Sequence, residues 1–250
     1  MLKSDLSSLQ YPPAEIHAKR EEVRRALLQS SPHLNGGRIT RILESDLKLL
    51  FDLYDQLFFY DYFRDQFPGQ LLFSLSARMT KTAGQTIYPR NLKELFPHKE
   101  RYELRISVIL LFSYEKLDRD KAVNGIKTRD SLEALQLVFE HELCHLIELH
   151  CFKETSCRQK RFQALAVNLF GHTESGHRLP LMAEIATAKY GLSVGDRVSF
   201  QAEGETFSGV ISRITRRATI MVPDKNGPYR DQGGRRYCKF YVPLHLLQKS

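Results

Sequence analysis

DSLEALQLVFEHELCHLIELH, residues 130–150, combines a helix start, an apolar helical repeat and two histidines four residues apart. Asp130 is a favourable N-cap residue, and Glu133 three residues on completes the pattern of a capping box. The apolar residues that recur at helical spacing are Leu132, Leu135, Val138, Phe139, Leu143 and Leu146. The stretch therefore predicts a helix with an apolar face.

His141-Glu142-Leu143-Cys144-His145 within this helix is an H-E-x-x-H motif. Residues four apart share one face of a helix, so both imidazoles can reach one cation. Zinc accepts neutral imidazole nitrogens, and a carboxylate beside the site can take a proton from an activated water. The motif predicts His141 and His145 as Zn²⁺ ligands and Glu142 as the general base of a metallopeptidase. Cys144, on another face, is predicted to be buried.

Helices and strands are predicted on both sides of this motif. Residues 14–29 are expected to form an exposed charged helix, and Ser45 is expected to cap a helix at 45–58. Apolar or β-branched character predicts strands at 71–79, 82–89 and 102–112. Residues 118–129 are expected to be a polar connection. Further helices are predicted at 158–170 and 181–191, ending at Gly171 and Gly191.

The last 60 residues differ from the rest of the chain. Short alternating segments separated by Gly, Asn, Asp and Pro predict a small all-β unit of the SH3-like barrel type. The predicted organisation is a helical extension at 1–42, an α+β metallopeptidase domain at 43–190 and the barrel at 191–250.

Six segments around H-E-x-x-H resemble the SprT-like family of zinc metalloproteases, which includes the Spartan proteases of DNA–protein crosslinks. They occur in the family's order and are the predicted helix at 45–58, YDYF (60–63), LLFSLSARMTKTAG (71–84), LRIS (104–107), FEHELCHLIE (139–148) and RFQALAVNLFG (161–171). The resemblance covers about residues 43–185. It implies a compact α+β zincin core with a small sheet, a single zinc and endopeptidase activity. The family's zinc ribbon is absent, because Cys238 is the only cysteine of the C-terminal segment.

The resemblance also bears on the third zinc ligand. The family supplies it from a His-Gly pair just before the next helix, where an ungapped register places Arg158. Cys157 is one residue earlier, and a thiolate is a good zinc ligand, so Cys157 is the predicted third ligand. His172, His177 and Glu184 stay open as alternatives, as does a site with two histidines. His150 is expected at the surface.

The charge of the chain points to an anionic partner. The formal net charge is +8 and the pI is about 9.3. Residues 192–250 hold ten basic and five acidic side chains, which leaves +5 of that charge. DNA or RNA is therefore a candidate partner beside a protein substrate. The predicted phosphate contacts are Arg213, Arg216, Arg217, Arg235 and Arg236.

Composition also bears on where the protein is found and whether it contacts a membrane. The chain has no run of 18 apolar residues, and its N-terminus lacks the apolar segment of a signal peptide. Four cysteines in 250 residues suit a reducing compartment. The prediction is a cytoplasmic protein without a membrane partner. The rival to an enzyme is a nucleic-acid- or protein-binding module with a degenerate metal site.

Overall fold

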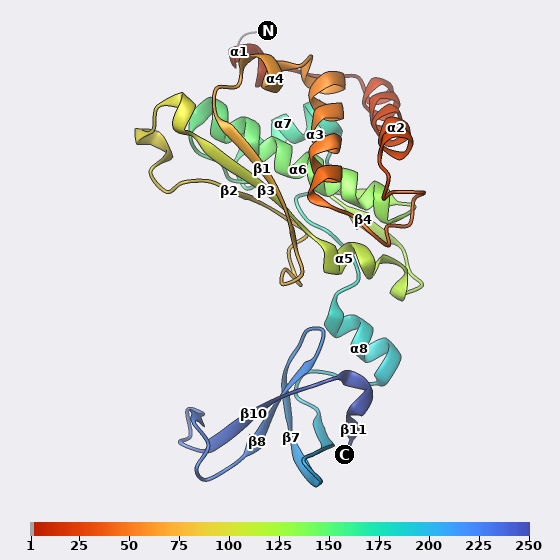
Figure 1. Cartoon of the computed structure of the whole chain (residues 1–250), viewed down its shortest axis with the longest axis vertical. Coiled ribbons are helices and arrows are strands. Elements are labelled where there is room, and N and C mark those ends of the chain that lie inside the picture. The colour runs from red at the N-terminus through yellow and green to blue at the C-terminus, as the bar shows by residue number, and fades with distance from the viewer. Residues whose placement is uncertain (1–2) are drawn as a thin grey trace. The chain divides into compact units, whose positions relative to one another are not determined.

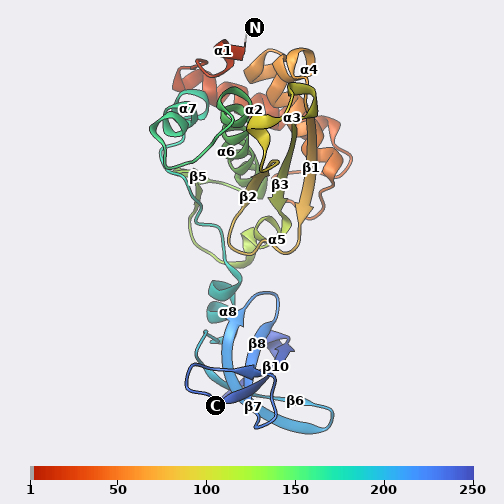
Figure 2. The ribbon, with the colours of Figure 1, turned by 90° about the vertical axis from the view of Figure 1, so that its left-hand side faces the viewer.

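The structure, a computed structural model, describes residues 3–250, and the chain divides between Leu179 and Pro180 into two compact units (Figures 1 and 2). Helices and strands both occur, so the predicted α+β class is confirmed. The division precedes α8 (Met182–Tyr190) instead of following it at 190/191 as predicted. The reason is packing, because Ala186 of α8 belongs to the apolar core of the second unit.

The first unit is built from helices around one small sheet. Its helices are α1 (Lys3–Leu6), α2 (Pro13–Ser30), α3 (Glu44–Phe59), α4 (Tyr62–Gln66), α5 (Val108–Phe112), α6 (Ser131–Phe152) and α7 (Lys160–Phe170). Its strands are β1 (Gln70–Ser76), β2 (Gly84–Ile87), β3 (Arg101–Ser107), β4 (Lys121–Val123) and β5 (Ile126–Thr128). No helix within residues 3–250 is both long enough and apolar enough to cross a membrane.

The sheet of the first unit has the strand order β1-β3-β2. β1 runs parallel to β3, with Leu71 opposite Tyr102, and β2 runs antiparallel to β3, with Gly84 opposite Ile106. The central helix α6 packs against β2 and β3 (Figure 1). β2 is therefore an edge strand that lies beside the helix carrying the H-E-x-x-H motif.

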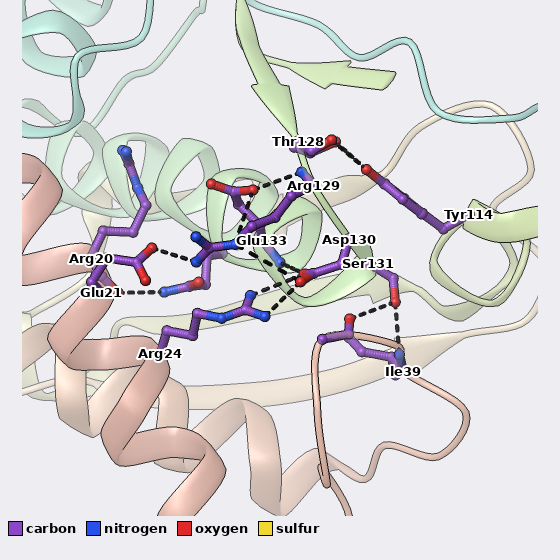
Figure 3. A network of polar contacts seen from close by, with 12 residues as sticks. Arg20, Glu21, Arg24, Ile39, Tyr114, Thr128, Arg129, Asp130, Ser131 and Glu133 are labelled. Atoms are coloured by element: carbon purple, nitrogen blue, oxygen red, sulfur yellow. Dashed lines mark hydrogen bonds and ion pairs between the residues drawn. The ribbon is translucent and has the colours of Figure 1, made fainter. Parts of the chain in front are cut away.

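The start of α6 is held by a polar network (Figure 3). The Asp130 carboxylate accepts a hydrogen bond from the Glu133 backbone N at 2.9 Å, which confirms the predicted N-cap. It also accepts from both terminal nitrogens of Arg24, at 3.0 and 2.6 Å. Burial opposes ionisation of Asp130, but the hydrogen bonds from Arg24 and Glu133 bring its pKa below the ordinary value. The charged cap fixes where α6 begins.

Residues 102–112 do not form one strand as predicted. β3 ends at Ser107, and Val108–Phe112 continue as the short helix α5. The Ser107 hydroxyl accepts a hydrogen bond from the Leu110 backbone N at 3.3 Å, and this cap turns an apolar segment of strand character into a helix.

Residues 118–129 contain a hairpin where a polar connection was predicted. β4 and β5 pair antiparallel around Asn124 and Gly125, whose φ angles are +52° and +83°. Asn-Gly is the dipeptide that two-residue hairpin turns favour, because both positions need positive φ.

The cap of α3 also differs from the prediction. α3 begins at Glu44, so Ser45 lies inside the helix and Leu43 occupies the N-cap position. The Asp46 carboxylate accepts from the Leu43 backbone N at 2.8 Å and from the Ser31 hydroxyl at 2.7 Å. The side chain that satisfies the helix start thus comes from within the first turn.

The second unit is a six-stranded antiparallel sheet beside α8. Its strands are β6 (Arg197–Ala202), β7 (Glu205–Ile214), β8 (Ala218–Pro223), β9 (Tyr229–Arg230), β10 (Arg236–Val242) and β11 (Gln248–Lys249). Their order in the sheet is β11-β6-β7-β8-β10-β9. Alternate residues of these strands, Val198, Phe200, Ile211 and Ile220 among them, bury an apolar core of their own.

Candidate metal centre

His141, His145 and Cys157 come together in the first unit. The two histidines lie on α6, and Cys157 lies in the connection between α6 and α7. One ligand atom from each of the three lies within 4.8 Å of the other two, and all three residues are half-buried. The structure thus places the three predicted ligands in one group. Two imidazole nitrogens and one thiol suit zinc, which binds nitrogen and sulfur donors.

Phe162 of α7 forms one wall of this group. Its ring centroid lies 5.0 Å from that of His141 and 4.4 Å from that of His145. The two imidazole centroids are 4.9 Å apart. Phe162 is fully buried, so α7 confines both rings by packing and excludes water from one side of the group.

Both histidines are in the form that binds a metal. Burial lowers the pKa of His141 to about 3, and the charges of His145 and His172 act in the same direction. Burial lowers the pKa of His145 to about 4. Near neutral pH both rings are therefore uncharged, and each has one nitrogen lone pair to offer.

Glu142 follows His141 on α6, and its carboxylate lies against β2. Burial raises the pKa of Glu142 to about 7, while hydrogen bonds with Thr86 oppose the rise. The Thr86 hydroxyl lies 2.8 Å from Oε2 of Glu142. A carboxyl group with a pKa near 7 can exchange a proton with water at neutral pH, as a general base must.

Gly84 makes room for the Glu142 carboxylate. A Cβ at position 84 would lie 2.5 Å from Oε1 of Glu142 and 2.8 Å from its Cγ. Any other residue would push the buried carboxylate away from the strand. Gly84, the last residue of the segment 71–84, thus allows the close approach of this carboxylate to β2.

The alternative histidine ligands lie elsewhere. Nε2 of His172 is 2.9 Å from Oε2 of Glu140, in the core behind His141. His177 has both ring nitrogens in contact with backbone atoms, Nε2 with the Lys81 carbonyl at 2.8 Å and Nδ1 with the Leu179 N at 3.2 Å. Glu184 lies on α8, in the second unit. Among residues 3–250, the group of His141, His145 and Cys157 includes none of His172, His177 and Glu184.

His150 corrects a further prediction. It is buried, not at the surface, and its Nε2 lies 2.9 Å from the hydroxyl of Tyr62. Its ring packs at 5.1 Å from that of Phe67. Apolar rings of α4 and the following segment cover the end of α6, and they enclose a residue that a simple helix would leave exposed. Cys144 is buried as predicted.

A buried ionic cluster behind His141 was missed in the sequence. Glu140 accepts from Nε and Nη2 of Arg20 at 2.7 and 2.8 Å and from the Tyr54 hydroxyl at 2.7 Å. Burial opposes its charge, but Arg20 and His172 bring the pKa of Glu140 below the ordinary value. Arg20 is buried, so α2 is not the exposed helix predicted. The available signal was a carboxylate in the apolar part of a helix, which demands a partner.

The five arginines predicted to contact phosphates are exposed but form two groups. Three lie at the end of β7 and in the β7–β8 connection, and two lie at the end of the β9–β10 connection and the start of β10; they are Arg213, Arg216 and Arg217, and Arg235 and Arg236. β8 and β10 are paired along their length, with Ala218 opposite Val242 at one end and Pro223 opposite Tyr237 at the other. The two connections therefore lie at opposite ends of these strands. A strand of this length spans roughly 17 Å, too far for a single arginine cluster.

The outer face of the second sheet, away from its core, carries exposed tyrosines beside basic side chains. Tyr241 and Lys239 alternate along β10 with core residues, so they face away from the core. Tyr241 is 64% exposed and Tyr229 of β9 is 41% exposed. The Lys239 ammonium lies 3.6 Å from the centre of the Tyr229 ring. Arg213 is opposite Thr219, which is opposite Tyr241, so all three side chains lie on this face.

Compared with protein families, with curated proteins and with solved structures, the chain has no match.

Proposed function

We propose that this chain is a zinc-dependent endopeptidase of the SprT-like type. The observation that supports this most is the group of His141, His145 and Cys157, together with the buried Glu142 that follows His141 on the same helix. The residues fit the metal, since the histidines are neutral, the donors are nitrogen and sulfur, and three protein ligands leave a position for water. When bound, zinc supplies Lewis acidity, which polarises a substrate carbonyl and makes water a better acid.

The residues of the chain have distinct roles in this proposal. His141, His145 and Cys157 hold the metal, and Phe162 keeps the two imidazoles in place. Glu142 takes the proton from the attacking water and passes it to the leaving amine, for which its pKa of about 7 is suited. β2 has β3 as its strand neighbour on one side, and its other edge can pair with the backbone of an extended peptide.

The metal content of the purified chain tests this proposal. We expect elemental analysis to find one zinc per chain after dialysis, and a chelator to remove both the zinc and the ability to cleave an unfolded protein. Restoring zinc should restore cleavage. A chain that never retains zinc would instead support a binding module with a degenerate metal site.

A second proposal concerns the second unit, which we take to be an SH3-like β-barrel that binds single-stranded DNA or RNA on the outer face of its sheet. Exposed tyrosines offer rings on which bases stack, and Arg213, Lys239 and Arg197 supply positive charge on the same face. The outward-facing positions that pair across β6, β7, β8 and β10 include no acidic residue. Proteins held on nucleic acid are then the natural substrates.

Replacement of Tyr241 tests this surface. We expect Tyr241→Ala in the full chain to weaken binding of a single-stranded oligonucleotide about tenfold, because a stacked base contributes roughly 1–3 kcal/mol. Tyr60→Ala removes a comparably exposed tyrosine of the first unit and should bind like the parent. The measurement is fluorescence anisotropy across a salt series.

Arginine variants separate the sheet face from the strand connections. Arg213→Gln should lower the slope of log affinity against log salt by roughly 0.7, while Arg235→Gln should leave it unchanged. The face is not the binding surface if Tyr241→Ala and the parent bind alike.

A further inference from the structure

We infer that Glu148 and Thr155 are positioning residues that set the tautomer of His145 and hold the Cys157 connection against it. This inference rests on the proposed metal centre. It deepens that proposal by naming residues that make a metal ligand of His145 without contacting the metal.

Glu148 lies on α6 three residues after His145, and its side chain is completely buried. Its Oε1 accepts a hydrogen bond from Nε of Arg161 at 2.8 Å. Its Oε2 accepts from the Thr155 hydroxyl at 2.7 Å and from the Ser156 backbone N at 3.3 Å. The carboxylate therefore joins α6, the connection that follows it and the first turn of α7.

The direction of these hydrogen bonds determines the state of His145. A carboxylate paired with a guanidinium only accepts hydrogen bonds, so the single hydroxyl proton of Thr155 points to Glu148. Nδ1 of His145 lies 2.6 Å from the same hydroxyl oxygen, which can then only accept. Nδ1 consequently carries the ring proton, and the lone pair of His145 is on Nε2. Nε2 is the atom that this tautomer offers to a metal.

The same carboxylate also fixes the path of the chain to Cys157. Thr155 and Ser156, which both bond to Glu148, are the two residues directly before Cys157. α6 ends where Lys153 adopts a left-handed conformation, with φ of +59°, and Lys153 pairs with the buried Glu100. The connection is thus held at both of its ends, and the thiol of Cys157 is brought to the histidines.

His141 has no equivalent arrangement. Its Nδ1 is buried and has no hydrogen-bond partner among the described residues. Phe162 packs against both rings, so packing alone does not distinguish the two histidines. The hydrogen-bonded support through Thr155 is therefore specific to His145, and its removal should change one ligand and not the other.

The first test reads the tautomer in the metal-free chain. Long-range ¹H–¹⁵N correlation spectra should show His145 with its proton on Nδ1 in the parent chain and in Thr155→Ser, which keeps the hydroxyl. In Thr155→Val, which has the same shape without the hydroxyl, the signals of His145 should shift towards a mixture of tautomers. A parent chain with the His145 proton on Nε2 would overturn the inference, whether or not the chain binds zinc.

The second test measures metal affinity. Thr155→Val should weaken zinc binding about 10–100-fold, the usual effect of losing a partner of a ligating histidine, and Thr155→Ser should restore most of it. Thr187→Val is the matched control, because its hydroxyl lies within hydrogen-bond distance of the Ala183 and Leu192 carbonyls in the second unit, at 3.2 and 3.1 Å. With Co²⁺ in place of zinc, Thr155→Val should alter the visible spectrum, and Thr187→Val should not.

The outcomes separate this inference from the proposed function. If the parent binds zinc and Thr155→Val binds it equally tightly, the positioning role is wrong and the metal centre stands. If the parent binds neither zinc nor Co²⁺, the metal centre is wrong, and with it any role of Glu148 and Thr155 in presenting a ligand.

Discussion

Glu142→Gln is expected to lower kcat/KM for peptide hydrolysis by about 10²–10⁴-fold while leaving the zinc content and the fold unchanged. An amide of the same size cannot accept a proton from water at neutral pH. It can still accept the hydrogen bond from Thr86 and fill the space beside Gly84. Cleavage of an unfolded protein substrate, measured with elemental analysis and thermal denaturation on the same samples, gives the result.

His141→Ala provides the contrast to this variant. Loss of a ligand should remove zinc together with activity, whereas Glu142→Gln should separate the two. The proposed role of Glu142 would be excluded by a Glu142→Gln enzyme that retains zinc and cleaves as fast as the parent.

Cys157→Ser should weaken zinc binding by more than about 100-fold, because even the loss of a residue that only supports a ligand costs roughly 10–100-fold. A neutral hydroxyl replaces a thiolate that neutralises part of the metal's charge. With Co²⁺ bound, the charge-transfer absorption of a thiolate ligand should be present in the parent and absent in Cys157→Ser. This absorption identifies sulfur as a ligand and would not change through an indirect effect on stability.

Two control variants test whether the effect is specific to Cys157. Cys238→Ser removes a free thiol of the second unit and should keep both the affinity and the absorption. His177→Ala should also bind zinc like the parent, because His177 contacts backbone atoms away from the group. If Cys157→Ser keeps the parental affinity and His177→Ala loses it, the ligand assignment is wrong.

The sequence alone determined the features that depend on neighbours within one or two helical turns. The cap of α6 at Asp130 needs only the backbone three residues on, and Gly171 and Gly191 end α7 and α8 with positive φ. The spacing of His141 and His145 places both on one face of any helix. A local error, such as the helix α5, arose where one capping serine outweighed β-branched character.

Only the tertiary structure decided which distant residues join these local features. Cys157, and not His172, lies with His141 and His145 because of how the connection after α6 folds back, and buried Glu148 bonds to that connection at Thr155 and to α7 at Arg161. The fit of Gly84 against Glu142 depends on β2 packing beside α6. Such contacts form because buried polar groups must have hydrogen-bond partners. Side chains far apart in the sequence can become these partners only once the core has formed.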